Sequence, residues 1–156
     1  MKIDWKKLLL CLAIPLGVGV LATLLTGNGM RAYAELNRPP LSPPGWVFGV
    51  VWTILYLLMG YASYLVWTAD ADEESKKKAL KLYSAQLAVN YLWPLVFFGL
   101  QWRLLAFGIL VVLWVLIYYT IRAFSDIDEK AGNLMLPYIV WVSFAAYLNL
   151  GAYLLN

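Results

Sequence analysis

The hydrophobic positions of this chain gather into five long segments, which are separated by short polar ones. Each segment is close to the roughly 20 residues that a helix needs to cross the hydrocarbon core of a bilayer. The segments cover about residues 8–26, 46–67, 79–101, 104–124 and 133–155. The pattern predicts an all-α integral membrane protein, a bundle of five transmembrane helices that forms a single domain over residues 1–156.

Composition agrees with this interpretation. The chain is 63% hydrophobic and only 13% charged, with a mean hydropathy of +0.71, whereas a soluble domain would be about 25% charged. Lys2, Lys6 and Lys7 precede the first apolar segment, as in a secretory signal peptide. Because no small-residue cleavage site precedes the next polar loop, we expect this segment to be retained as a helix.

The Lys and Arg residues predict the orientation of the bundle. With five spans, the amino terminus shares one side with the loops at 69–78 and 125–132. That side carries nine basic residues: Lys2, Lys6, Lys7, Lys76, Lys77, Lys78, Lys81, Arg122 and Lys130. The other side carries three: Arg31, Arg38 and Arg103. The positive-inside rule therefore places the amino terminus in the cytoplasm and the carboxyl terminus outside.

The longest polar loop, about residues 27–45, contains four prolines at positions 39, 40, 43 and 44. Prolines fix φ and press the preceding residue out of helix, so this stretch should be stiff and extended. Residues 30–37 could form two helical turns that carry Tyr33. We expect a structured lid at the mouth of a cavity; a solvated connector is the alternative.

The second apolar segment carries an aromatic stripe: Phe48, Trp52 and Tyr56 recur at steps of four. Interfacial aromatic residues belong at the ends of membrane helices, and Trp52 and Tyr56 lie deeper than that. A buried ring with a polar tip needs a hydrogen-bond partner or a ligand. Packing between helices explains the stripe equally well.

The third segment places Gln86, Asn90, Trp93 and Phe97 on one face. Amide side chains near the middle of a membrane are costly unless they are hydrogen-bonded, either to another helix or to a ligand. Pro94 breaks the backbone ladder beside Trp93 and can orient that ring.

Ser84 and Ala88 lie on a different side of the same segment. A pair of small residues four positions apart permits the close approach of another helix. We therefore expect a homodimer that meets at Ser84 and Ala88.

The fifth segment carries Trp141, Ala145 and Asn149 at steps of four, which gives an aromatic wall next to a recess. Asn149 again requires a partner. Tyr138 and Tyr153 lie toward opposite ends of the segment, where we expect interfacial anchors.

Several kinds of function are disfavoured. The chain has one Cys, Cys11, which cannot form an internal disulfide, and no His, which removes the commonest metal and axial haem ligand. No carboxylate, Lys or Arg lies well inside a span, which argues against ion-coupled transport, and no nucleophile–base set points to an enzyme. The acidic block at 70–74 cancels the lysines at 76–78, so a nucleic-acid partner is not expected.

What remains is an aromatic cavity with a few neutral hydrogen-bonding groups. Such a lining suits a flat, mostly apolar ligand better than an ion or a sugar. The candidate residues are Trp52, Tyr56, Gln86, Asn90, Trp93, Phe97, Trp141 and Asn149.

Three motifs in order resemble the translocator protein / tryptophan-rich sensory protein (TspO/MBR) family over nearly the whole chain. They are Pro43-Pro44-Gly45-Trp46-Val47-Phe48-x3-Trp52-x3-Tyr56, Ala85-Gln86-Leu87-x2-Asn90-x2-Trp93-x3-Phe97-Phe98, and Pro137-Tyr138-x2-Trp141-x3-Ala145-x2-Leu148-Asn149. The resemblance implies a dimeric five-helix membrane receptor, of bacterial type and so in a bacterial cell membrane. It also implies binding of tetrapyrroles such as protoporphyrin IX and haem, of isoquinoline and benzodiazepine drugs, and in animal members of cholesterol.

The resemblance also implies a set of pocket residues: Tyr33, Trp52, Tyr56, Asn90, Trp93, Trp141 and Ala145. It leaves three roles open: sensing or regulating porphyrin levels, degrading porphyrin in light through Trp52, Trp93 and Trp141, and passive transport. A tetrapyrrole would be a ligand here, not an obligatory cofactor, and no metal site is expected. Tyr153 is followed only by Leu154, Leu155 and Asn156, so the family's weak cholesterol pattern is incomplete and no sterol site is expected.

Overall fold

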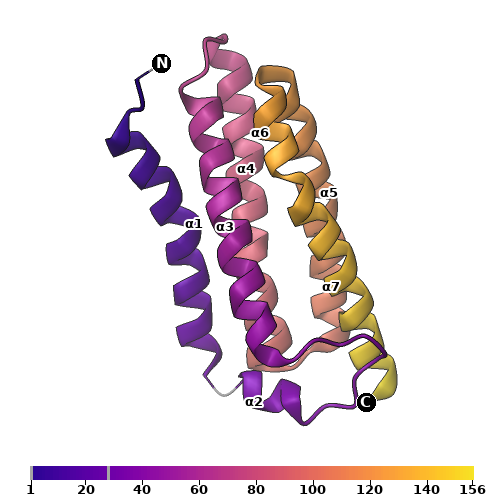
Figure 1. Cartoon of the computed structure of the whole chain (residues 1–156). Coiled ribbons are helices and arrows are strands. Elements are labelled where there is room, and N and C mark those ends of the chain that lie inside the picture. Colours follow the sequence, from indigo (N-terminus) through magenta and orange to yellow (C-terminus); the bar gives the residue numbers. More distant parts are fainter. Residues whose placement is uncertain (1, 28) are drawn as a thin grey trace.

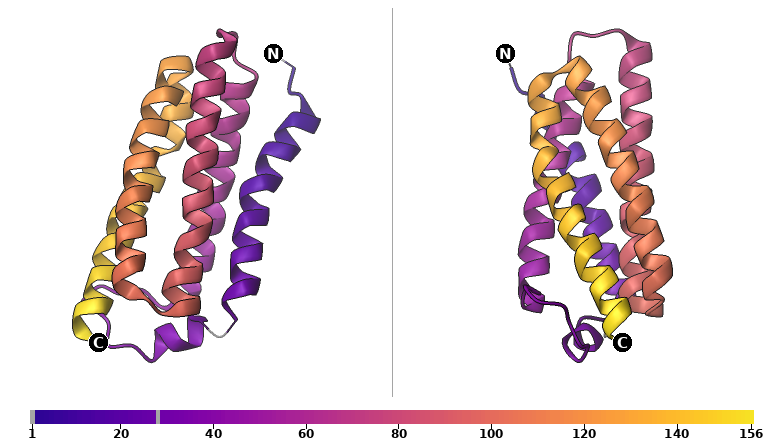
Figure 2. Two further views of the ribbon diagram at one scale, coloured as in Figure 1. Left: turned by 180° about the vertical axis from the view of Figure 1, so that it is seen from behind. Right: turned by 90° about the vertical axis from the view of Figure 1, so that its right-hand side faces the viewer.

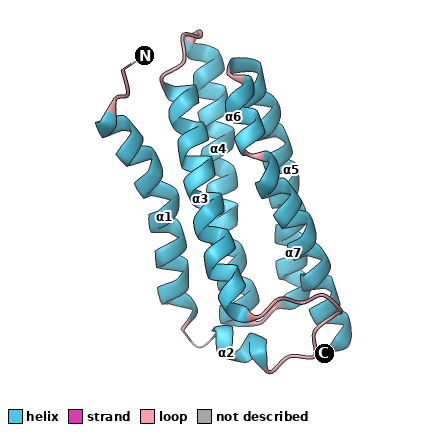
Figure 3. Ribbon diagram, viewed as in Figure 1, coloured by secondary structure: helices cyan, strands magenta, loops and turns pink. Residues whose placement is uncertain are grey.

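A computed structural model of the chain, described for residues 2–27 and 29–156, is built from helices joined by short loops (Figures 1 and 3). The long helices run alongside one another, and α2 lies across the end of the bundle where the chain terminates. The elements are α1 (Trp5–Thr26), α2 (Gly29–Ala34), α3 (Gly45–Trp67), α4 (Glu73–Pro94), the π-helix η1 (Leu95–Leu100), α5 (Arg103–Ile127), α6 (Glu129–Leu134) and α7 (Leu136–Leu155).

The expectation of an all-α membrane protein is confirmed, but the count of five helices is not matched. In the described part of the chain, 4 helical stretches are long and apolar enough to cross a membrane: α1, α3, α5 and the stretch Glu129–Leu155 formed by α6 and α7. α4 falls below this hydropathy because its first turns carry Glu73, Glu74 and the lysines at 76–78. The number of separate helices, in contrast, is larger than predicted. α2 forms in the lid loop, and the fifth predicted helix divides at Met135.

Polar caps explain why several helices begin before their apolar segments. The Asp4 carboxylate accepts from the Lys7 N–H at 3.2 Å, so α1 begins at Trp5 instead of residue 8. The Asp72 carboxylate accepts from the Ser75 N–H at 3.1 Å, so α4 begins six residues earlier than predicted, at Glu73. Hydrogen bonds from Ser75 lower the pKa of Asp72, as expected of a carboxylate that caps a helix.

The third predicted helix divides at Pro94, whose missing N–H removes one bond of the backbone ladder. The α-helical ladder ends there, and the following turns widen into η1. Gln101 then adopts a left-handed conformation (φ 59°) that stops the helix and turns the chain into α5. The widened turn carries Phe97 and Phe98 into the aromatic cluster described below.

The lid loop is held to the carboxyl end of the bundle by hydrogen bonds that span most of the sequence. The Tyr147 hydroxyl donates to the Pro40 carbonyl at 2.7 Å, and Asn156 Nδ2 donates to the Asn37 carbonyl at 2.8 Å. A Cβ on Gly151 would lie 2.5 Å from Pro39 Cγ, so the proline sits directly on α7. The lid is therefore structured, and its helix α2 is shorter and begins earlier than the predicted 30–37.

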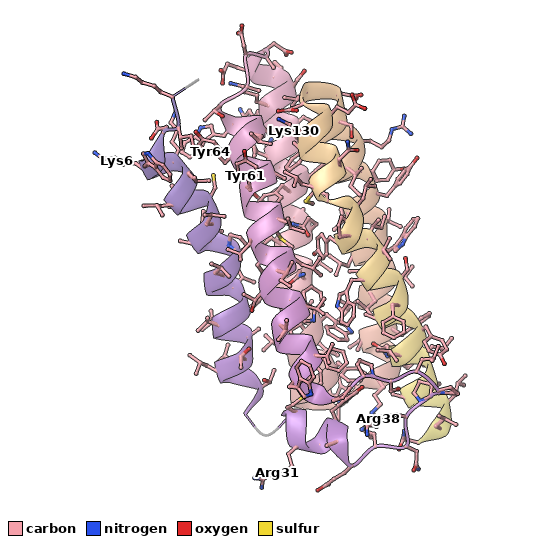
Figure 4. All side chains as sticks on the ribbon, in the orientation of Figure 1. Lys6, Arg31, Arg38, Tyr61, Tyr64 and Lys130 are labelled. Carbon is pink, nitrogen blue, oxygen red and sulfur yellow. The ribbon has the colours of Figure 1, made fainter. Side chains whose placement is uncertain are left out.

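Charged side chains lie at the two ends of the bundle (Figure 4): Lys6 and Lys130 at one end, Arg31 and Arg38 at the other. Between these ends the helices pack through apolar and small residues, as is usual in membranes. α5 lies against both α4 and α7, and α1 lies against α3 at the edge of the bundle (Figure 2). A Cβ on Gly60 of α3 would lie 2.7 Å from the Cys11 carbonyl oxygen of α1.

We expect Gly60→Ala to destabilise the protein by about 1–3 kcal/mol, because the added methyl meets the α1 backbone, which cannot move aside locally. Thermal unfolding in detergent micelles would measure the loss. Gly108→Ala is the matched control, since a Cβ there meets nothing within 4 Å, and its better helix propensity should leave stability equal or higher. Equal effects of the two substitutions would contradict close packing of α1 on α3.

Candidate ligand-binding site

A cavity of about 470 Å³ lies between α1, α3 and the end of α4, next to the first residues of the lid. It is lined mainly by apolar and aromatic side chains. Five of the predicted site residues are in its lining: Phe48, Trp52, Tyr56, Asn90 and Trp93. The cavity therefore gathers the aromatic stripe of α3 and one amide of α4 at a single place.

Trp52 is the centre of the aromatic wall. Its ring stacks on Tyr56 at 5.7 Å between centroids and lies 6.4 Å from Trp93. On its other side, Trp52 meets Tyr138 at 6.2 Å and Trp141 at 6.4 Å, both edge to face. One indole thus joins rings from α3, α4 and α7, and such pairs favour a fixed arrangement of the wall.

A continuous chain of buried hydrogen bonds runs behind this wall. The Tyr56 hydroxyl donates to Asn90 Oδ1 at 2.8 Å, and Asn90 Nδ2 donates to the Tyr138 hydroxyl oxygen at 2.7 Å. The Tyr138 hydroxyl in turn donates to Gln86 Oε1 at 2.6 Å. The chain links α3, α4 and α7, and it satisfies most of the polar atoms that the membrane interior would otherwise leave unpaired.

A second set of bonds fixes the Trp93 ring. Trp93 Nε1 donates to Asn149 Oδ1 at 2.9 Å, and Asn149 Nδ2 donates to the Arg103 carbonyl at 2.8 Å. The buried amides were expected to bond either another helix or a ligand. Gln86, Asn90 and Asn149 all bond a side chain of another helix. Asn90 alone of the three also lines the cavity.

The other predicted site residues form a layer behind the lining. Tyr33 is the buried residue of the lid, with its ring 5.1 Å from that of Phe48. Phe97 stacks on Trp93 at 5.2 Å. Trp141 meets Phe48 at 5.8 Å, and Ala145 is buried on α7 near it. Their contact with a ligand stays a prediction.

Tyr138 is the residue that the sequence interpretation placed wrongly. We expected an interfacial anchor, but its side chain is 1% exposed and forms the junction of the hydrogen-bond chain. Its position three residues before Trp141, on the same helical face, was the available signal. The prediction relied instead on the position of Tyr138 near the start of the apolar segment, where interfacial residues are common.

Sequence comparisons with known proteins identify the family. The sequence profile of the TspO/MBR family matches residues 11–154. This chain belongs to the TspO/MBR family. A tryptophan-rich sensory protein of Cereibacter sphaeroides is 40% identical over 159 aligned positions, which cover 100% of this chain and 95% of that protein. A translocator protein of Homo sapiens is 39% identical over 139 positions, covering 88% and 82%.

A tryptophan-rich protein TspO of Archaeoglobus fulgidus is 35% identical over 151 positions, covering 96% of this chain and 97% of that protein. The family resemblance drawn from the three motifs is therefore confirmed. The described residues of this TspO/MBR chain include no group of three His, Cys, Asp or Glu that could hold a metal ion.

The α1 side of the cavity was not foreseen. Leu16, Gly19, Val20 and Thr23 complete the lining opposite the aromatic wall. A Cβ on Gly19 would lie 2.5 Å from Tyr56 Cε2, so the glycine lets the tyrosine ring rest directly on α1. Aliphatic and small residues in a membrane helix look the same whether they face lipid or a ligand, so no sequence signal could separate these positions.

We expect Tyr138→Phe to reduce stability by about 1–3 kcal/mol, because it leaves Asn90 Nδ2 and Gln86 Oε1 without their buried partner. Tyr153→Phe is the control, since that side chain is 42% exposed and its change should stay within about 0.5 kcal/mol. Both variants would be compared by thermal unfolding in the same detergent. A Tyr138→Phe protein as stable as the control would show that the hydrogen-bond chain does not hold the helices.

Proposed function

We propose that this protein is a membrane receptor that binds tetrapyrroles such as protoporphyrin IX or haem in its aromatic cavity and so senses or regulates porphyrin levels. The supporting observation is the cavity itself: two indoles, Trp52 and Trp93, and the Tyr56 ring line one mainly apolar space. Flat conjugated ligands gain most from such stacked walls. The name of the Cereibacter sphaeroides relative, a sensory protein, is consistent with this role.

The proposed receptor spans the membrane five times, with α4 and η1 together as the third span. From residue 82 to residue 100 this stretch carries no charged side chain, and it runs beside α5 along the length of the bundle (Figure 2). The nine-to-three distribution of basic residues supports an amino terminus in the cytoplasm. Ser84 and Ala88 are exposed on α4, as a homodimer through these residues requires.

The charges at the lid suit the acidic groups of a tetrapyrrole. The cavity lining contains Met30, and Arg31 follows it in α2. The Arg38 guanidinium lies 5.1 Å from the centroid of the Tyr33 ring, at the same end (Figure 4). Propionate groups would meet these arginines while the macrocycle stays in the apolar cavity. Neutral isoquinoline or benzodiazepine drugs would use the same walls without that contact.

Haem would bind without strong axial ligation. The chain has no His, and the Tyr56 hydroxyl at the cavity already donates to Asn90. The haem complex should therefore lack the Soret signature of His coordination.

One observation favours a second function, the light-driven breakdown of bound porphyrin. Trp93, Trp52 and Trp141 form a continuous series of indoles with 6.4 Å between successive centroids. An excited porphyrin could withdraw an electron from the nearest indole, with dioxygen as the final oxidant. Illumination of the complex in air separates the two functions: a defined product that disappears in Trp→Phe variants supports an enzyme, and bleaching equal to that of free porphyrin supports a receptor.

We expect Trp52→Ala and Trp93→Ala each to weaken protoporphyrin IX binding by about threefold to tenfold, because each removes a stacking surface from the cavity. Saturable quenching of the remaining tryptophan fluorescence would report the dissociation constant. Trp114→Ala is the control, since its indole bonds Ser143 on the outer face of the bundle, far from the cavity lining. Unchanged affinity in both cavity variants would remove the site assignment.

Replacing Pro43 and Pro44 with Ala should raise the rate of ligand release more than it lowers stability. These prolines hold the segment that joins α2 to α3, and the Pro43 carbonyl lies 3.4 Å from the Tyr33 hydroxyl. A looser segment opens the lid more often, which stopped-flow displacement of bound porphyrin would measure. If unfolding temperature falls sharply while release is unchanged, the segment is scaffold and not a lid.

A further inference from the structure

The aromatic cavity reaches the surface of the bundle between α1 and α3. These two helices lie next to each other at one edge of the bundle (Figures 1 and 2), and both contribute to the lining. Six lining residues of the two helices are exposed: Val20, Thr23 and Leu24 on α1, and Trp46, Gly49 and Thr53 on α3. Residues that belong both to a cavity and to the surface mark its opening. We call this opening, bounded by the six residues, the slot.

The slot runs lengthwise along the two helices, in the part of the bundle near the lid. Trp46, Gly49 and Thr53 are three and four residues apart, so they follow one face of α3. From the first to the last of them is about 10 Å at 1.5 Å per residue. Leu24 is 73% exposed and Trp46 is 71% exposed, so this side of a membrane-spanning bundle faces acyl chains. A flat macrocycle could pass edge-on through an opening of this shape.

The two edges of the slot are not bonded to each other. In the part of the chain that the structure describes, no hydrogen bond joins α1 to α3 beside the cavity. The Thr23 hydroxyl donates to the Gly19 carbonyl at 2.9 Å, and the Thr53 hydroxyl donates to the Gly49 carbonyl at 2.7 Å. Each hydroxyl proton thus stays within its own helix. α1 and α3 can separate here without leaving a polar group unpaired in the membrane.

The end of the cavity under the lid is held more firmly. Tyr33 in the lid is 4% exposed, and its ring lies 5.1 Å from that of Phe48 and 6.1 Å from that of Phe98. The lid loop is also hydrogen-bonded to α7 through Tyr147 and to the end of the chain through Asn156. Opening the lid would break these contacts, whereas opening the slot disturbs apolar packing alone.

We propose that the ligand enters the aromatic cavity sideways, from the hydrocarbon interior of the bilayer, through the slot between α1 and α3. The molecule that the protein takes up is then the membrane-dissolved form of a flat, mostly apolar compound, and the lid separates the bound ligand from water. This inference rests on the proposed function. Loosening the prolines at 43 and 44 would add an exit through the lid, but the intact chain uses the slot.

Stopped-flow fluorescence of the full chain in phosphatidylcholine vesicles tests the route, with protoporphyrin IX as the probe. Gly49→Phe places a ring in the slot, since a Cβ at Gly49 meets nothing within 4 Å. Association and dissociation should each slow by about tenfold, because both pass through the slot, and the dissociation constant should stay within about twofold. Gly17→Phe is the matched control: Gly17 is exposed on α1, a Cβ there also meets nothing within 4 Å, and it is outside the lining.

A second substitution obstructs the slot from its other edge. Val20 on α1 is 60% exposed and lines the cavity, so Val20→Phe should slow both rates as Gly49→Phe does. Leu25→Phe is its control, because Leu25 is 57% exposed on the same helix and outside the lining. Neither control should change either rate. The pair keeps the test decisive if one of the two slot variants folds poorly.

Two results would overturn the proposal. If the folded slot variants bind and release protoporphyrin IX at the rates of the intact chain, the ligand passes through the lid. If their affinity falls while the association rate is unchanged, the substituted positions contact bound ligand and do not form a passage. A failure of the proposed function looks different, since the intact chain itself would then show no saturable quenching by protoporphyrin IX.

Discussion

The fold of this protein depends on one constraint: a bilayer interior offers no water to its polar side chains. The long helices of the bundle carry Gln86, Asn90 and Asn149, and each amide makes at least one hydrogen bond to another element. The longest series of bonds, from Tyr56 through Asn90 and Tyr138 to Gln86, ties α3, α4 and α7 into one unit. The helices that carry these groups cannot separate without leaving several buried polar atoms unpaired.

The position of the cavity follows from the same bonds. α1 contributes no amide side chain to them; it meets α3 through Gly19 and Gly60, where only glycine allows the observed approach. A hydrogen bond from the Asp4 N–H to the Tyr64 hydroxyl joins α1 to α3 at the amino-terminal end, whereas beside the cavity α1 meets the bonded unit through packing. Most polar atoms of this unit are hydrogen-bonded to one another. The surface that the unit presents to α1 is therefore mainly aromatic. The interactions that hold the helices together also produce a lining suited to a flat apolar ligand.

Sequence patterns predicted the membrane class, the lid and the aromatic lining from α3 and α4, because each has a strong local cause: apolar length, proline geometry, or a ring repeated every four residues. They could not predict what depends on neighbours. Tyr138 seemed interfacial because depth in the membrane cannot be read from one helix. The contribution of Gly19 was invisible because a wall residue of α1 resembles a lipid-facing one. The third predicted helix loses its α-helical form at Pro94, yet the π-helix after it depends on packing.

The central claim is that the tetrapyrrole binds between α1 and the aromatic wall, and not on the α7 side of Trp141. Protection of single cysteines from a maleimide would test it most directly, in a background where Cys11 is replaced by Ser. Thr23→Cys lies in the cavity lining, whereas Ser143→Cys lies on the outer face of α7. The account predicts that protoporphyrin IX slows labelling at position 23 and leaves position 143 unchanged. Labelling at position 23 that is unaffected by saturating ligand would contradict it.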